Sequence, residues 1–302
     1  MMIGTQKKQV SYISKRHHFF LTILIMIILV SCSFTRTTTD TKPFFFFQMA
    51  DTQFGMFTND SVFTKETINF EKAIESANRL RPSFVVVCGD LVNQLENQQQ
   101  IAEYKRIAAK LDPSIPLYNV AGNHDVGTTQ PTEKGLSNYR KHFGPDYYSF
   151  RSGNLYGIVL NSSLFFDPSL VPLEADRQDA WLRSTLEKAS KIKNVNIVVF
   201  QHIAWFTSAP DEKNGYFNIP LARRQTYLDL FHKHGIKYIF AGHFHKNSIG
   251  WDGDLEMVTT GPVGKPLGKD PSGFRIVTLN GSKISHTYYS LDSIPANIRL
   301  ND

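Results

Sequence analysis

Side chains that can bind metal ions or transfer protons gather in five short segments of this 302-residue sequence. The segments are Asp51-Thr52-Gln53, Gly89-Asp90, Gly122-Asn123-His124-Asp125, Gln201-His202 and Gly242-His243-Phe244-His245. Carboxylate and amide oxygens and imidazole nitrogens are suitable ligands for divalent transition metals. The residue types in these segments therefore favour a metal-dependent site.

Two cations in such a site would suit a displacement at phosphorus. A pair of cations about 3.5–4 Å apart stabilises both the attacking and the leaving oxygen of an in-line displacement. Cations that share a hydroxide need one carboxylate that can bridge them. Asp90 is the candidate for this bridge.

The elements between these segments indicate a layered α/β domain, because short apolar runs alternate with amphipathic stretches from Phe44 onward. Buried strands are predicted over residues 44–49, 84–88, 117–121, 196–200 and 237–241, and helices over 65–80, 98–111, 175–189 and 221–234. Three further strands, separated by turn residues, are predicted over 255–260, 274–279 and 283–289. No internal repeat and no long linker divides this region.

Each metal-competent segment directly follows one of the predicted strands. Ligands of open α/β sheets bind in the crevice beyond the carboxyl ends of the strands. We therefore expect the five segments to meet at one edge of a sheet. The glycines that precede these residues are expected to permit the sharp turns that aim the side chains across this edge.

Taken in order, the five segments resemble the sequence blocks of the calcineurin-like metallophosphoesterase superfamily. The resemblance covers residues 44 to about 292. It is strongest to the subfamily of calcineurin-like phosphoesterase-domain-containing proteins, whose eukaryotic member is described as a Ser/Thr protein phosphatase. The supporting stretches are Ala50-Asp51-Thr52-Gln53-Phe54-Gly55, Asn161-Ser162, Gln178-x-x-Trp181-Leu182, residues 267–273 and residues 288–292.

This resemblance implies a four-layer α/β sandwich of two mixed sheets flanked by helices, with a dinuclear centre of Mn, Fe or Zn and a bridging hydroxide. It also implies that His124, oriented by Asp125, protonates the leaving group. One implied metal group consists of Asp51, Gln53, Asp90 and His245, and the other of Asp90, Asn123, His202 and His243.

Gln53 departs from the broad superfamily, in which most members place His at this position. An amide oxygen is a harder and usually weaker ligand than imidazole. Because the nearest subfamily shares this Gln, we interpret the first metal site as tuned rather than lost.

The amino terminus resembles an export signal. A basic stretch that ends at Lys15-Arg16 precedes the apolar residues 19–30 and two small residues, Ser31 and Cys32. The run Leu29-Val30-Ser31-Cys32 resembles the lipobox of bacterial lipoproteins, so residues 1–31 are interpreted as a lipoprotein signal peptide and Cys32 as the lipidated residue. Residues 32–43 would then be a tether and 44–302 the metallophosphoesterase domain. A plain signal peptide and an uncleaved anchor are the alternatives.

The basic balance of the chain does not indicate nucleic-acid binding. The net charge of +6 includes four basic side chains in residues 1–31, which contain no acid, and the remainder has 29 basic and 27 acidic side chains. A nucleic-acid interface needs a clustered basic face, and no dense basic run follows Arg16. We expect a monomer, without a nucleic-acid partner, that is exported and anchored to a membrane of a bacterial cell envelope.

These features predict a phosphoester hydrolase that acts as a phosphomonoesterase on a phosphoprotein-like or small phosphorylated substrate. The alternatives are a phosphodiesterase or nucleotide hydrolase on the same site, and a binding lipoprotein without activity. The pair His124-Asp125 argues against the last alternative, because a passive scaffold has no use for a leaving-group acid. No Arg follows this pair to clamp phosphate, unlike in the Ser/Thr phosphatases of the calcineurin group.

Overall fold

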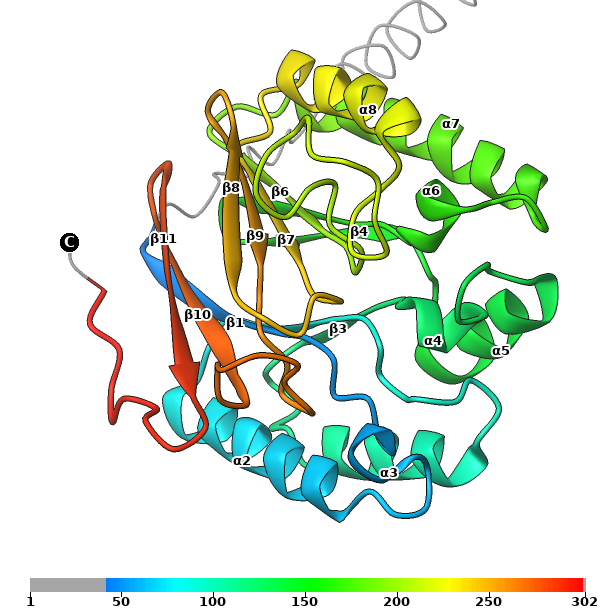
Figure 1. Cartoon of the computed structure of the whole chain (residues 1–302). Coiled ribbons are helices and arrows are strands. Elements are labelled where there is room, and N and C mark those ends of the chain that lie inside the picture. Colours follow the sequence, from blue (N-terminus) through cyan, green and yellow to red (C-terminus); the bar gives the residue numbers. More distant parts are fainter. Residues whose placement is uncertain (1–41, 301–302) are drawn as a thin grey trace, which may run out of the picture. The chain divides into compact units, whose positions relative to one another are not determined.

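Two mixed β-sheets carry the elements that position the site in the computed structural model, which describes residues 42–300 (Figure 1). The first sheet has the order β11-β10-β1-β2-β3, in which β1, β2 and β3 are parallel and β10 is antiparallel to β1. Its strands are β1 (Phe44–Met49), β2 (Val85–Cys88), β3 (Leu117–Val120), β10 (Gly273–Asn280) and β11 (Lys283–Ser290).

The second sheet has the order β4-β5-β6-β7-β9-β8. Its four central strands are parallel, and the strand at each edge is antiparallel to its neighbour. The strands are β4 (Tyr148–Ser152), β5 (Leu155–Val159), β6 (Asn196–Phe200), β7 (Tyr238–Ala241), β8 (Ser248–Asp252) and β9 (Leu255–Thr259).

The two sheets pack face to face through aromatic side chains. Phe46 of β1 lies with its ring centroid 5.8 Å from Phe200 of β6 and 6.1 Å from Phe240 of β7. All three rings are fully buried. Aromatic rings of this size contribute large buried areas, so this layer forms the central core of the domain.

Helices cover the outer face of each sheet. Figure 1 shows α2 and α3 beside the first sheet and α7 and α8 beside the second. On α2 the buried residues Phe70, Ala73, Ile74 and Ala77 follow the spacing of an amphipathic helix, and the helix ends where Arg81 adopts a left-handed backbone. The helices are η1 (Met56–Thr58), α2 (Thr64–Leu80), α3 (Gln98–Ala108), α4 (Asn123–Val126), α5 (Glu133–Phe143), α6 (Ser163–Phe166), α7 (Pro172–Ala189) and α8 (Leu221–Lys233).

This arrangement confirms the predicted four-layer sandwich of two mixed sheets flanked by helices. Every predicted strand and helix is present with similar bounds, whereas β4, β5, β8, α5 and the short helices η1, α4 and α6 were not predicted. The expectation of one sheet edge needs a correction. Three of the five metal-competent segments follow strands of the first sheet and two follow strands of the second, so the site lies where the carboxyl ends of both sheets meet.

Some predictions fall on residues that the structure does not describe. The signal peptide, Cys32 and most of the tether lie outside residues 42–300. Within that range no helix combines the length and the apolar character needed to cross a membrane.

Candidate metal centre

Most candidate ligands lie just after the strands and have unusual backbone dihedral angles. Five of the seven have positive φ angles, which are uncommon for residues other than glycine. Such backbone strain costs about 1–3 kcal/mol per residue and gathers at functional sites, which favours a functional role for these turns. The φ angles are 52° at Asp51, 33° at Gln53, 49° at Asp90, 67° at His243 and 54° at His245.

The carboxylates and imidazoles form two groups that share one residue, Asp90. One group contains Asp90, His202 and His243, and the other contains Asp51, Asp90 and His245. Within each group the ligand atoms lie within 4.8 Å of one another, and all five residues are buried. The shared position of Asp90 is the geometry that a bridging carboxylate requires.

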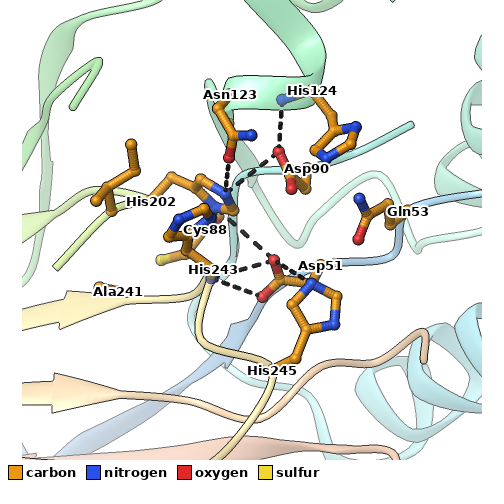
Figure 2. A network of polar contacts seen from close by, with 12 residues as sticks. Asp51, Gln53, Cys88, Asp90, Asn123, His124, His202, Ala241, His243 and His245 are labelled. Carbon is orange, nitrogen blue, oxygen red and sulfur yellow. Dashed lines mark hydrogen bonds and ion pairs between the residues drawn. The ribbon is translucent and has the colours of Figure 1, made fainter. Parts of the chain in front are cut away.

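Close contacts link these groups to one another and to Asn123 (Figure 2). His202 Nε2 lies 3.2 Å from Asp90 Oδ1 and 3.0 Å from Asn123 Oδ1. His245 Nε2 lies 3.3 Å from Asp51 Oδ1. Six of the seven side chains that the family resemblance implies as ligands, all except Gln53, are therefore brought together by these contacts and groups.

Each of the three imidazoles is held by a backbone carbonyl at one of its two ring nitrogens. His202 Nδ1 lies 2.8 Å from Cys88 O, His243 Nε2 lies 2.8 Å from Tyr216 O, and His245 Nδ1 lies 2.6 Å from Lys265 O. A metal-binding histidine commonly donates its second N–H in this way, which fixes the ring and leaves the first nitrogen free for the metal.

The two amide side chains show the same preference for presenting oxygen to the site. Asn123 Nδ2 donates to Thr128 O at 2.8 Å, and Gln53 Nε2 donates to Asn93 Oδ1 at 3.2 Å. Gln53 Oε1 is buried and has no hydrogen-bond partner among the described residues. Because a buried polar atom without a partner is costly, this oxygen fits a metal ligand that completes the first group.

Electrostatics also fit a cationic occupant. Burial opposes the ionisation of Asp90, yet His202 and His124 lower its pKa. Burial likewise opposes the charged form of His202, but Asp90 raises its pKa to about 9. Asp90 therefore stabilises positive charge at this position. Burial and then His202 lower the pKa of His243 to about 4, which keeps this imidazole neutral and able to bind a metal. Buried carboxylates beside imidazoles are a donor set that suits divalent transition metals.

Glycines permit the close approach of the segments, but only one of the three has the positive φ that the predicted sharp turns would use. Gly89 has a φ of 81°, and a Cβ there would lie 2.4 Å from His202 Nδ1. A Cβ at Gly122 would lie 2.1 Å from Asp90 N, and one at Gly242 would lie 2.6 Å from Asp51 Oδ2. Gly122 and Gly242 thus make room for the ligands rather than for a special turn.

The predicted orientation of His124 by Asp125 is wrong. The Asp125 carboxylate instead accepts from the backbone N–H groups of Leu91, Val92 and Gly122. These three backbone donors bind the Asp125 carboxylate, so it makes no hydrogen bond to the His124 imidazole. Burial and then Asp90 raise the pKa of Asp125 to about 7, although its backbone donors lower it.

His124 is oriented by a backbone carbonyl. Its Nδ1 lies 2.8 Å from Asn93 O, and its own backbone N–H donates to Asp90 Oδ1 at 3.0 Å. The Nδ1–H that faces Asn93 leaves Nε2 as the nitrogen that can carry a proton to a substrate. His124 belongs to neither of the two metal groups.

Two stretches that supported the family resemblance position His202. Ser162 Oγ accepts from the backbone N–H groups of His202 and Ile203 at 3.2 and 2.8 Å. The buried Gln178 side chain pairs with both the N–H and the carbonyl of Asn161. These polar residues therefore hold the segment after β6 in place.

Sequence reasoning missed the residues that support the ligands. Asn93 contacts both Gln53 and His124, and Tyr216, an exposed loop residue, lies with its hydroxyl 3.3 Å from Asn123 Nδ2. Lys265 acts through its backbone carbonyl. Asn93 lies three residues after Asp90, but no pattern in the sequence indicates these partners.

Comparison with known proteins agrees with this geometry. Residues 46–247 match the family described as calcineurin-like phosphoesterase. The chain is 36% identical over 267 residues to serine/threonine-protein phosphatase CPPED1 of Danio rerio, covering 83% of this chain and 86% of the relative. It is 37% identical over 268 residues to the protein of the same name in Homo sapiens, covering 83% and 85%.

Solved structures show a similar fold. A dimetal phosphatase from Danio rerio has a TM-score of 0.56 at 16% identity, covering 82% of this chain and 99% of that one. A purple acid phosphatase from yellow lupin has a TM-score of 0.62 at 14% identity, covering 83% and 52%.

Proposed function

The chain belongs to the calcineurin-like phosphoesterase family, and we propose that it is a phosphomonoesterase with two divalent metal ions in its active site. The observation that carries this proposal is the position of Asp90, which belongs to both metal-competent groups. A phosphoester hydrolase with two cations needs one carboxylate that both can share.

The metal groups would each contain four side chains. The first would consist of Asp51, Gln53, Asp90 and His245, and the second of Asp90, Asn123, His202 and His243. When bound, the two cations would supply charge that stabilises the attacking and leaving oxygens of an in-line displacement. The metals are proposed to be Mn, Fe or Zn, since carboxylate, amide and imidazole ligands suit these ions.

The chain itself would supply the proton. His124 donates Nδ1–H to Asn93 O, so its Nε2 would transfer a proton to the oxygen of the leaving group. Asp125 fixes the backbone of the segment that follows Asp90. Asp125 would thus position Asp90, rather than His124.

The substrate is proposed to be a phosphomonoester on a phosphoprotein or on a small molecule. This proposal is supported by the similar proteins from Danio rerio and Homo sapiens, which are serine/threonine-protein phosphatases and are covered over most of their length. Metal-stripped protein, reloaded separately with Mn, Fe and Zn, should hydrolyse an aryl phosphomonoester and a phosphopeptide faster than an aryl phosphodiester. We expect a difference in kcat/KM of at least about tenfold, which corresponds to about 1.4 kcal/mol.

Protein that is stripped and not reloaded serves as the control for metal dependence. A preference for the diester would contradict the monoesterase proposal and favour a phosphodiesterase on the same site. Equal activity with and without metal would contradict the metal-dependent function itself.

We also propose that the protein is exported and held at a membrane of a bacterial cell envelope by a diacyl group on Cys32. The lipobox-like residues 29–32 support this proposal. Cys32→Ala should abolish incorporation of labelled lipid and should release or mislocalise the protein, because no thiol would remain at the cleavage site to accept the lipid. Lipid labelling and membrane fractionation would measure both effects.

Cys88→Ala is the matched control, since Cys88 is the other cysteine of the chain and is buried. This variant should keep its lipid. Unchanged membrane attachment of the Cys32→Ala protein would instead favour an uncleaved amino-terminal anchor.

A further inference from the structure

A chain of hydrogen bonds leads from a carboxylate outside the metal groups to the Gln53 amide. Asp60 Oδ1 accepts from Asn93 Nδ2 at 2.8 Å. Asn93 Oδ1 accepts in turn from Gln53 Nε2 at 3.2 Å. At the end of the chain, the buried Gln53 Oε1 has no partner within residues 42–300.

The direction of these hydrogen bonds follows from Asp60. An ionised carboxylate accepts hydrogen bonds and cannot donate them, so Asn93 must turn its NH₂ group toward Asp60. Only the Asn93 oxygen then remains for Gln53, which must turn its own NH₂ group toward Asn93. The Gln53 oxygen is consequently directed away from this chain.

We propose that Asp60, acting through Asn93, is a positioning residue that fixes the Gln53 amide with its oxygen toward the first metal ion. The inference rests on the proposed two-metal function. It explains how a glutamine serves at this position. A reversed Gln53 amide would present its N–H groups to the cation. Without a hydrogen-bond partner of fixed direction, a glutamine side chain has no intrinsic preference between the two orientations.

The surroundings of Asp60 hold this carboxylate in place. Gln100, which is fully buried, donates Nε2 to Asp60 Oδ1 at 2.6 Å and accepts from Asn93 N at 3.1 Å. Gly55 permits the contact, since a Cβ there would lie 2.5 Å from both Asp60 Oδ1 and Gln100 Nε2. Asp60 and Asn93 therefore have little freedom to rearrange.

Asn93→Ala tests the proposal, because it removes the side chain between Asp60 and Gln53 but keeps the carbonyl that contacts His124. Full-length protein, stripped of metal, would be titrated with Mn²⁺ and followed by calorimetry. We expect two binding steps in the native protein. In the variant one step should weaken by about 10–100-fold, the usual effect of losing a partner of a metal ligand, and the other should remain.

Gln94→Ala is the matched control. Gln94 is exposed and donates Nε2 to Asp60 Oδ2 at 2.7 Å, but it does not lie between Asp60 and Gln53. This variant removes one hydrogen bond from the same carboxylate and should leave both binding steps unchanged. Equal weakening of both steps by Asn93→Ala, or no weakening of either, would overturn the proposal.

Repeating Asn93→Ala in a Gln53→Glu variant distinguishes an effect on the orientation of the Gln53 amide from a general disturbance of the loop. A carboxylate offers equivalent oxygens in both orientations, so in a Gln53→Glu background the further change Asn93→Ala should not weaken Mn²⁺ binding by more than about twofold. The same 10–100-fold weakening in both backgrounds would show that Asn93 acts on the loop rather than on the amide.

Failure of the inference differs from failure of the proposed function. If the native protein shows fewer than two Mn²⁺ binding steps, the dinuclear function is wrong. If it shows two steps and Asn93→Ala leaves both intact, only the role of Asp60 and Asn93 is wrong.

Discussion

Asp90→Asn is expected to abolish phosphatase turnover while the fold remains intact. In the native protein Asp90 Oδ1 accepts a hydrogen bond from the backbone N–H of His124 at 3.0 Å. The introduced amide keeps an oxygen that can accept the same bond. The variant loses the negative charge that both metal groups share. Because even a partner of a metal ligand is worth about 10–100-fold in metal affinity or activity, loss of the shared ligand should lower kcat/KM by more than about 100-fold. Metal analysis and steady-state kinetics would measure both effects.

Asp112→Asn provides the matched control for this change. Asp112 is a partly exposed carboxylate that pairs with Arg81 away from the metal groups, so its replacement should change neither metal content nor turnover. Circular dichroism of both variants checks the fold. Full metal content and full activity in the Asp90→Asn protein would show that the two groups do not share this residue as a ligand.

The strands that carry the site could be predicted because they are short apolar runs in the interior. β1 (Phe44–Met49) and β6 (Asn196–Phe200) have the bounds that the sequence predicts. Nearly all of β1 is buried between the other sheet and the helices. Strands covered on both faces read as continuous hydrophobic runs, and the polar segment that follows such a run therefore marks the end of the strand.

The elements that were not predicted have weaker patterns for physical reasons. β4 and β8 lie at the edges of the second sheet, so each is hydrogen-bonded to one neighbouring strand and is partly exposed. β5 contains Gly157, where a Cβ would lie 2.4 Å from the Phe150 ring, and α5 contains Gly135, where a Cβ would lie 2.0 Å from Val126 O. Glycine is unfavourable inside strands and helices, so packing rather than propensity selects these two residues.

The ligands of the site were predictable as residue types, but their supporting contacts were not. Asp51 and His243 come from different sheets, yet the Asp51 carboxylate accepts from the His243 backbone N–H at 3.0 Å. His124 is held by the carbonyl of Asn93 rather than by its neighbour Asp125. A backbone carbonyl is present at every residue, so no residue type in the sequence signals such a contact.

The same limit applies to the amide of Gln53. The sequence indicates that a glutamine stands where most of the superfamily has histidine, but not which of its two polar atoms faces the metal. That orientation depends on Asp60 and Asn93, which become neighbours only when the loop after β1 meets the loop after β2.

His124→Ala is expected to separate catalysis from metal binding. His124 is partly buried, belongs to neither metal group and has Nδ1 directed at Asn93 O. Removal of the imidazole should therefore leave both metals and the substrate affinity in place. General acid catalysis contributes about 10²–10⁴-fold in rate, so kcat should fall within this range for a substrate whose leaving group needs a proton.

The size of the loss should depend on the leaving group. The alkoxide of phosphoserine leaves poorly without a proton, so its hydrolysis should show the large effect. The phenolate of nitrophenyl phosphate leaves unaided, and its hydrolysis should slow much less. His234→Ala is the matched control, because His234 is partly exposed, contacts Ser190 and lies away from the metal groups.

Parallel measurements of kcat on both substrates and of metal content decide the role of His124. Equal losses on phosphoserine and nitrophenyl phosphate would indicate that His124 binds the phosphate rather than donating a proton. Loss of metal would indicate that it is a ligand after all. An effect confined to the poorer leaving group, at full metal content, is the result that a proton donor at Nε2 requires, because only a group that acts on the departing oxygen distinguishes the two substrates.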